Sequence, residues 1–411
     1  MWGQEIVRSV TEEYNKLKGP RTPGFGTLSL SMYSSSHPAE HRFPVWWTGD
    51  VHYTELLDNV HKMVNGGTNL QPYVHPDCGA HYGAVNTSET PEMFVRWVQF
   101  CSMGTIIRIH SNTCCDHRPW TWGWEAEDAI RDTLKRRYAL IPALVAAGKL
   151  ATADGTPVVA RLDLEFPALG PDGASRADQY TLAKDLLVAP IIPFNGSAGT
   201  AVNPTNGACN RSRTVWVPPG DWQDAWSNAT ITGPKLITVA DVPMSQIPMW
   251  HRKGSMMVTT EPGLSTSEQD WSALNLEVFP FKHGSKGGVA HTEFYDTKLG
   301  DTHHRSTLKL NQGVDGSVEV AIGAGARDRV WRIRVHLAAD ETVQGVDNVD
   351  VSNVNDAHDG SQVFTAAVDA DLSFQLRRGQ RVVEMAVHVK AGNLGSVHFM
   401  LAGYTQEQVQ L

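Results

Sequence analysis

Residues 71–110 read QPYVHPDCGAHYGAVNTSETPEMFVRWVQFCSMGTIIRIH, and this stretch decides the fold. Its first apolar letters predict a strand, and a polar loop that carries Asp77 follows them. Thr90-Pro91 predicts the start of a helix, because threonine is a good N-cap and proline suits the first helical turn. A second strand is expected over residues 105–109. The order strand, loop, helix, strand is typical of a βα unit with parallel strands.

The same pattern is found on both sides of this stretch. Before it, we expect a helix over residues 6–17, a strand over 27–32, and a helix that ends at Gly66-Gly67 and carries Leu56, Val60, Met63 and Val64. After it, we expect one helix whose apolar stripe consists of Ile130, Leu134, Tyr138, Ile141 and Val145. Repeated units of this kind imply parallel strands with covering helices.

Beyond about residue 150 the apolar period changes from 3.6 to 2, which predicts β-domains. Apolar and polar residues alternate from Trp331 to Leu337 and from Val383 to Lys390, as expected of half-buried antiparallel strands. A polar stretch, 259–269, separates two such regions. We therefore expect three domains, over residues 1–150, 151–258 and 259–411.

The composition and net charge of the chain exclude some classes of ligand and favour others. The 411 residues carry a formal net charge of -9 and 13 tryptophans, which argues against nucleic acid as a partner and suits neutral sugars. No run of about twenty apolar residues could span a bilayer, and no export signal is seen near Met1. Sequons at Asn86, Asn195, Asn210 and Asn228 are compatible with a secretory pathway, so the localisation stays open.

The five cysteines do not form a disulfide framework. Cys78 and Cys101 could pair, and a reduced pair is an equal alternative. His37 and His41 are spaced like a metal pair, but Pro38 removes the helix that would align them, so we expect loop residues. We predict no metal and no cofactor.

Polar residues stand where the strands of the βα units should end: Asp50, Asp77, and Arg108 with His110. In a closed barrel these ends open on one face, so residues remote in sequence meet there around one ligand. Each aspartate taken alone could instead be a turn former or a helix cap.

Trp46-Trp47-Thr48-Gly49-Asp50 resembles the W-[ST]-G-D signature of glycoside hydrolase family 31, which surrounds the general acid/base. The resemblance implies that Asp50 takes this role and that Trp47 forms part of the sugar-ring wall. Apolar indole neighbours disfavour a charged carboxylate, as a proton donor requires. Two core tryptophans beside a capping aspartate are the structural alternative.

The segment from His75 to His81 resembles the family's D-x-G-G-[FH] element, in which the aspartate binds sugar hydroxyls. The resemblance implies that Asp77 and His81 contact substrate. Ala80 stands in place of the second glycine, and it would strain the loop unless its φ is negative. Arg108-Ile109-His110 resembles the R-x-H element, which implies that Arg108 and His110 contact the sugar, with His110 on a hydroxyl.

Further segments resemble family segments in the same order, so the likeness covers nearly everything up to residue 258: Arg96 to Phe100, Arg118 to Trp120, Arg137 to Pro142, Arg161 to Pro167, Asp185 to Pro190, Val215 to Trp222 and Ile247 to Ser255. The implied fold is α/β plus all-β. It consists of the C-terminal half of a (β/α)8 TIM barrel followed by two β-sandwich domains.

The sequence departs from the family at one essential point. The family's nucleophile lies in a W-x-D-x-N-E element upstream of the first helix, and no such string occurs in this chain. An arginine that the family places before the W-[ST]-G-D loop is also absent, and Arg42 matches another family position. A retaining glycosidase needs two carboxylates, and only the acid/base is expected here.

Two functions therefore stay open. The first is a retaining α-glycosidase, α-glucosidase-like, that acts on an α-linked oligosaccharide or glucoside. The second is a catalytically inactive carbohydrate-binding or assembly homologue. Half a barrel would expose the edges of its sheet, so we expect a partner, either a separate amino-terminal half or a second copy of the chain.

Overall fold

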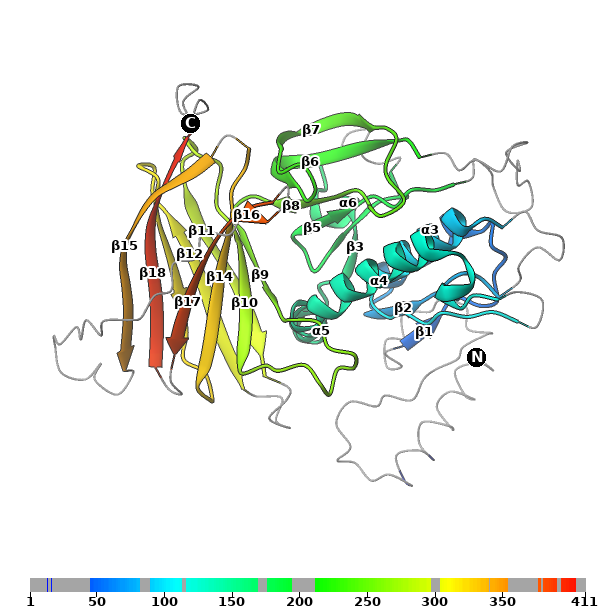
Figure 1. Cartoon of the computed structure of the whole chain (residues 1–411), viewed down its shortest axis with the longest axis horizontal. Coiled ribbons are helices and arrows are strands. Elements are labelled where there is room, and N and C mark those ends of the chain that lie inside the picture. Colours follow the sequence, from blue (N-terminus) through cyan, green and yellow to red (C-terminus); the bar gives the residue numbers. More distant parts are fainter. Residues whose placement is uncertain are drawn as a thin grey trace. The chain divides into compact units, whose positions relative to one another are not determined.

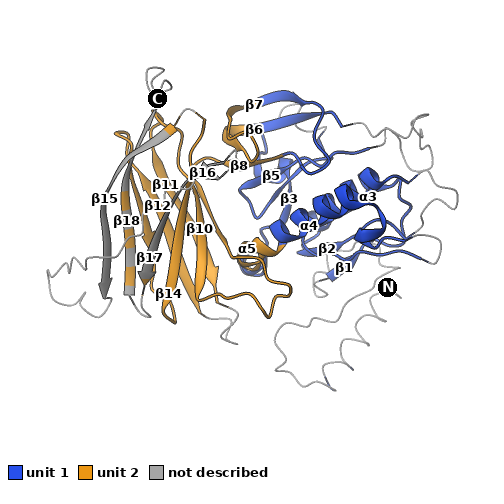
Figure 2. Cartoon of the chain, viewed as in Figure 1, with its two compact units in different colours: residues 1–137, 147–218, 235–248 blue, residues 138–146, 219–234, 249–411 orange. Residues whose placement is uncertain are grey.

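The computed structural model describes two N-terminal positions, Glu13 and Lys16, and most of the chain beyond Val45. The described ranges are 45–81, 89–112, 116–168, 176–193, 211–296, 304–339, 341–353, 376–377, 380–389 and 393–403. The chain forms two compact units (Figures 1 and 2). Unit 1 comprises residues 1–137, 147–218 and 235–248, and unit 2 comprises residues 138–146, 219–234 and 249–411.

Unit 1 contains a pair of parallel strands, of which the one near Val74 is predicted from the sequence, whereas none is predicted over Val45–Trp47. β1 (Val45–Trp47) pairs in parallel with β2 (Tyr73–His75), and helix α2 (Leu56–Thr68) connects them. The predicted apolar stripe of α2 is confirmed, because Leu56, Val60, Met63 and Val64 are all buried. Gly66 and Gly67 lie in its last turn, where a Cβ would collide with Val74 and with the Val159 carbonyl. These glycines thus allow the helix to pack closely on its neighbours.

Helix α3 (Pro91–Ser102) begins as predicted, with the Thr90 hydroxyl accepting a hydrogen bond from the Met93 amide at 3.4 Å. The strand predicted over 105–109 is wrong: these residues form only an isolated bridge between Cys78 and Ile109. Side chains replace the expected ladder. The Thr105 hydroxyl bonds to both the amide and the carbonyl of Val74, and the Arg137 guanidinium donates to the carbonyls of Gly104 and Thr105.

The single helix predicted after this segment is in fact two. A short 3-10 turn, η2 (Pro119–Thr121), precedes helix α4 (Trp124–Ala139), and α5 (Ile141–Asp154) follows after Leu140. Pro142 explains the break, because it has no amide hydrogen and its ring clashes with the preceding turn of a continuous helix. The predicted domain boundary at residue 150 therefore lies inside α5.

Unit 1 continues with β3 (Val159–Arg161), the short α6 (Leu162–Glu165), β4 (Tyr180–Leu182) and β5 (Leu186–Val188). These strands pair antiparallel, β3 with β4 and β4 with β5. β6 (Arg213–Asp224) and β7 (Thr230–Val239) follow. In unit 2, the end of β6 pairs antiparallel with β8 (Met249–Arg252).

The rest of unit 2 is a sandwich of two five-stranded sheets, ordered β16-β17-β14-β10-β9 and β11-β12-β13-β18-β15 (Figure 1). The strands are β9 (Ser255–Thr259), β10 (Ala273–Phe279), β11 (Gly288–Tyr295), β12 (Arg305–Gln312), β13 (Ser317–Ile322), β14 (Arg329–His336), β15 (Glu341–Asn353), β16 (Leu376–Arg377), β17 (Gln380–Val389) and β18 (Asn393–Gly403). One core is shared by both sheets and includes Trp271, Leu276, Phe294, Leu310, Val320, Trp331 and Ile333. The predicted boundary at 258 lies inside β9.

The alternation predicted along β14 is confirmed, with Trp331, Ile333 and Val335 buried and the residues between them half-buried. β14 runs antiparallel to β17, as predicted, but parallel to β10. The alternation of buried and half-buried residues is the same in parallel and antiparallel strands, so the sequence does not predict the direction of β10 relative to β14.

Several sequence predictions fall outside the described residues, including the helix over 6–17, the strand over 27–32, His37, His41, Arg42 and the sequons at Asn86, Asn195 and Asn210. The fourth sequon, Asn228, is only 5% exposed, and its side-chain oxygen accepts a hydrogen bond from Gln223. Cys78 and Cys101 are buried and free, so the reduced alternative holds. Among the described residues, no helix is both long enough and apolar enough to cross a bilayer.

Candidate active site

The six residues singled out from the sequence lie together in unit 1, beyond the carboxyl ends of β1 and β2: Trp47, Asp50, Asp77, His81, Arg108 and His110. Trp47 is the last residue of β1, and Asp77 follows β2 by two positions. Because the two strands are parallel, their ends share one edge of the sheet.

Backbone hydrogen bonds connect the three loops that carry these side chains. The Cys78 amide donates to the Arg108 carbonyl at 3.0 Å, and the His110 amide donates to the Cys78 carbonyl at 3.0 Å. The His81 amide donates to the Val51 carbonyl at 2.9 Å, next to Asp50. The loops therefore hold one another in place.

Asp77 is the centre of the cluster and is fully buried. Its Oδ1 accepts hydrogen bonds from the Trp47 indole at 2.7 Å and from the Arg108 guanidinium, which also lies 5.6 Å over the Trp47 ring. Its Oδ2 has no hydrogen-bond partner in the described part of the chain and lies 3.8 Å from His110 Nε2. One oxygen is thus fixed by two donors, and the other keeps unused capacity to accept a hydrogen bond.

His81 and His110 form the second part of the cluster. His81 Nδ1 and His110 Nε2 are 2.7 Å apart, so one nitrogen donates and the other must be unprotonated. Burial lowers the pKa of His110. The nearby Asp77 carboxylate raises this pKa, but Arg108 and His81 lower it and offset that effect. A hydrogen-bonded pair of imidazoles offers both donor and acceptor nitrogens to hydroxyl groups.

Asp50 lies at the rim of the cluster. Its side chain is 36% exposed, and its Oδ1 is 3.7 Å from His81 Nδ1. Trp47 is buried and its N–H is committed to Asp77, and shielding of the Asp50 carboxyl by the indoles stays a prediction. The carboxyl of Asp50 is accessible to solvent.

The turn that presents Asp77 is strained. Ala80 has φ +85, in the left-handed region, so the substitution for glycine anticipated from the sequence does strain the loop. This conformation costs an alanine about 1–2 kcal/mol. The Ala80 amide donates to the Asp77 carbonyl at 2.8 Å, which closes the turn. A Cβ on Gly79, at φ +89, would approach Phe94 to 2.8 Å.

His117, which the sequence analysis did not single out, forms a hydrogen bond with the backbone of His110. His117 Nδ1 bonds to the His110 carbonyl at 2.6 Å, and its Nε2 bonds to Glu89 at 3.0 Å. Burial alone lowers the pKa of His117, but the hydrogen bond and charge of Glu89 outweigh it and raise the pKa above 6.5. The two histidines are seven residues apart in the sequence, and nothing in their spacing indicates that they meet.

A metal ion could also be considered, because one ligand atom from each of Asp50, Asp77, His81 and His110 lies within 4.8 Å of the others. Mixed nitrogen and oxygen donors of this kind suit Zn²⁺ or a similar ion. The Arg108 guanidinium on Asp77, however, already supplies a positive charge there. The same groups equally suit the hydroxyls of a sugar ring, so the absence of a metal stays a prediction.

Comparisons with known proteins place the chain in a family. The profile described as "Glycosyl hydrolases family 31 TIM-barrel domain" matches residues 7–147, and that described as "Glycosyl hydrolase family 31 C-terminal domain" matches residues 155–257. A 1,6-alpha-glucosyltransferase of Sporosarcina globispora is 24% identical over 64% of this chain and 19% of its own length. An alpha-xylosidase of Saccharolobus solfataricus is 24% identical over 58% of this chain and 31% of its own length.

The fold is also similar to solved structures. A GH31 dextranase of Flavobacterium johnsoniae, complexed with isomaltotriose, aligns over 97% of this chain and 48% of its own with a TM-score of 0.73 and 19% identity. The chain thus spans less than half the length of these relatives. Its fold combines TIM-barrel and sandwich elements, and both profile matches together cover more than half of its residues. The chain belongs to glycosyl hydrolase family 31.

Proposed function

We propose that this chain supplies the proton-donating and sugar-binding part of a retaining α-glycosidase that hydrolyses O-glycosyl bonds. The observation that carries the proposal is the convergence of Asp50, Asp77, Arg108 and the His81–His110 pair beyond two parallel strands. Residues 1–150 would form the C-terminal half of a (β/α)8 barrel, followed by two β-sandwich domains.

Asp77 would anchor the sugar. Its free Oδ2 accepts from a ring hydroxyl, while Arg108, whose side chain is 36% exposed, donates to a neighbouring oxygen. His110, whose Nε2 is bonded to His81 and lies 3.8 Å from Asp77 Oδ2, would contact the same ring. Trp47 is 7% exposed and has little surface to offer a sugar ring. We therefore assign it the role of positioning Asp77 through its indole N–H.

Asp50 would protonate the glycosidic oxygen of the leaving group. It stands at the exposed rim, where a leaving group can depart into solvent, and its Oδ1 lies 3.7 Å from His81 Nδ1. After cleavage the Asp50 carboxylate would take a proton from water, as a general base does in the second half of a retaining reaction.

The nucleophile would come from a part of the family's catalytic domain that these 411 residues do not contain. Retaining enzymes hold the two carboxylates about 5–5.5 Å apart. Asp77 does not fit the role of nucleophile, because two hydrogen bonds hold its Oδ1 in place and the residue is fully buried. A separate amino-terminal half or a longer form of the chain would provide the missing group.

Hydrolysis of p-nitrophenyl α-glucoside tests the proposal. The chain would be assayed alone and mixed with the amino-terminal half of a family member, with Asp50→Asn as the inactive control. We expect turnover in the mixture and its loss in the variant. No turnover by a folded mixture would contradict the catalytic role.

The second function, carbohydrate binding without catalysis, is favoured by one observation. The hydroxyl-binding set of Asp77, Arg108 and His110 is complete within this chain. Calorimetry with maltose separates the two readings. Binding of maltose together with no hydrolysis in any mixture would support the binding function. If the folded chain neither binds maltose nor takes part in hydrolysis, both functions are contradicted. α-Glucosides are the substrates that we propose first, with α-xylosides next.

A further inference from the structure

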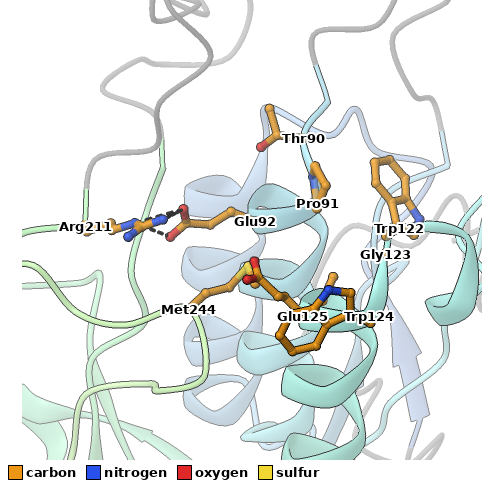
Figure 3. Close-up of a pocket in the computed structure, with 10 residues that line it drawn as sticks. Thr90, Pro91, Glu92, Trp122, Gly123, Trp124, Glu125, Arg211 and Met244 are labelled. Carbon is orange, nitrogen blue, oxygen red and sulfur yellow. Dashed lines mark hydrogen bonds and ion pairs between the residues drawn. The ribbon is translucent and has the colours of Figure 1, made fainter.

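A second pocket lies in unit 1 between the start of α3 and the start of α4, and none of its lining residues belongs to the candidate active site (Figure 3). Its volume is about 430 Å³. Binding sites for small molecules have volumes of roughly 300–1,000 Å³, so this pocket has room for a disaccharide. Residues Pro91, Glu92, Trp122, Trp124, Glu125 and Arg211 contribute its wall.

Two tryptophans give the pocket its character. Trp122 is fixed: its ring packs on Phe94 at 5.4 Å and on His117 at 6.2 Å, and its indole N–H donates to the Asp116 carbonyl at 2.8 Å. Trp124 is 72% exposed, an unusual position for so large an apolar side chain. Its indole makes no hydrogen bond or ring contact with the described residues, so a ligand would find its face open.

Charged groups complete the wall. Glu92 and Arg211 form a bidentate ion pair with distances of 2.7–3.0 Å, and Figure 3 shows this pair and the Trp122 ring on opposite sides of Pro91. The Arg211 side chain is 49% exposed, whereas that of Glu92 is 11% exposed. Glu125 is exposed and lines the same pocket. The wall therefore combines polar donors and acceptors with an aromatic surface.

We propose that this pocket is a second carbohydrate site, which binds a glucose disaccharide unit of an α-linked chain. A sugar has apolar C–H faces that stack on indoles and hydroxyls that both donate and accept. The pocket offers both kinds of surface. The choice of an α-linked glucose chain rests on the proposed function, but the presence of the site does not.

The test is calorimetry with maltose on the wild-type chain and on Trp124→Ala. Because Trp124 is largely exposed, its removal should leave folding intact. Trp120→Ala is the matched control, since Trp120 is 63% exposed and does not line the pocket. Asp77→Asn disables the first site independently. Circular dichroism verifies that each variant is folded.

We expect two binding events in the wild type. Trp124→Ala should weaken one of them about tenfold or more and leave the other, whereas Trp120→Ala should change neither. In Asp77→Asn the event that depends on Trp124 should persist, even if no variant or mixture shows hydrolysis. Maltose binding that is the same in Trp124→Ala and in the wild type, or no binding by the wild type, would overturn the second site.

Discussion

Replacing Asp77 by asparagine is the sharpest perturbation of the candidate site, because it removes a charge and almost no volume. Oδ1 of Asp77 accepts from two donors, Trp47 and Arg108, so the asparagine oxygen must occupy that position. Its NH₂ group then takes the place of Oδ2, facing His110. An acceptor for a sugar hydroxyl thereby becomes a donor.

The magnitude follows from the type of bond. Hydrogen bonds to a charged group contribute about 1.5–3 kcal/mol and those to a neutral group about 0.5–1.5 kcal/mol, so each of the two donors loses about 1 kcal/mol. The free energy of unfolding should therefore fall by about 2 kcal/mol. We expect no larger loss, because Arg108 is partly exposed and solvent screens part of its charge. Loss of the ligand bond should weaken sugar binding at this site tenfold to about a hundredfold.

Calorimetry with maltose and urea unfolding measure the two effects. Asp163→Asn is the matched control, because Asp163 forms an ion pair with Arg161 in which both side chains are partly exposed. There the same chemical change should alter stability by less than about 1 kcal/mol and leave binding unchanged. If Asp77→Asn binds maltose at this site as tightly as the wild type does, Asp77 is not the sugar anchor.

The remaining predictions concern protonation, a buried ion pair and metals. His117→Gln should destabilise the protein more at pH 5.5 than at pH 9, in urea titrations at both pH values, because a pKa raised above 6.5 gives stability below that value and loses it as the pH rises through the folded-state pKa. Lys253→Met should cost about 3–5 kcal/mol in urea unfolding, since it leaves Glu341 charged and buried, and Lys253→Met with Glu341→Gln should recover part of the loss. Excess EDTA should leave maltose calorimetry unchanged, and a fall in affinity would instead assign a metal to Asp50, Asp77, His81 and His110.

Much of unit 1 could be predicted from local signals. The stripe of α2 and the Thr90 cap of α3 are encoded within a few residues, so periodicity and capping rules find them. The segment 105–109 could not be predicted in this way. Its apolar letters favour a strand, but the Thr105 hydroxyl and the distant Arg137 take the backbone groups that a ladder would use. Local propensity cannot anticipate a partner that lies thirty residues away.

The membership of the candidate site was predictable, whereas its internal bonding was not. Parallel strand ends share an edge, which is why Asp50 and Asp77 meet, whereas His110 joins them through the isolated bridge between Cys78 and Ile109. Which oxygen of Asp77 is bonded and which is free depends on the orientation of Trp47 and Arg108. His117 escaped notice for the same reason, since its partners come from two other loops.

The free oxygen of Asp77 and the strain at Ala80 have one origin. The tight turn holds the aspartate inside, against Trp47 and Arg108, and among the described residues only its Oδ1 has hydrogen-bond partners. A buried carboxylate oxygen without a partner costs stability, and so does an alanine at φ +85. Both costs become understandable if a ligand hydroxyl completes the site. Sugar binding and stability should therefore change in opposite directions in variants that relax this turn.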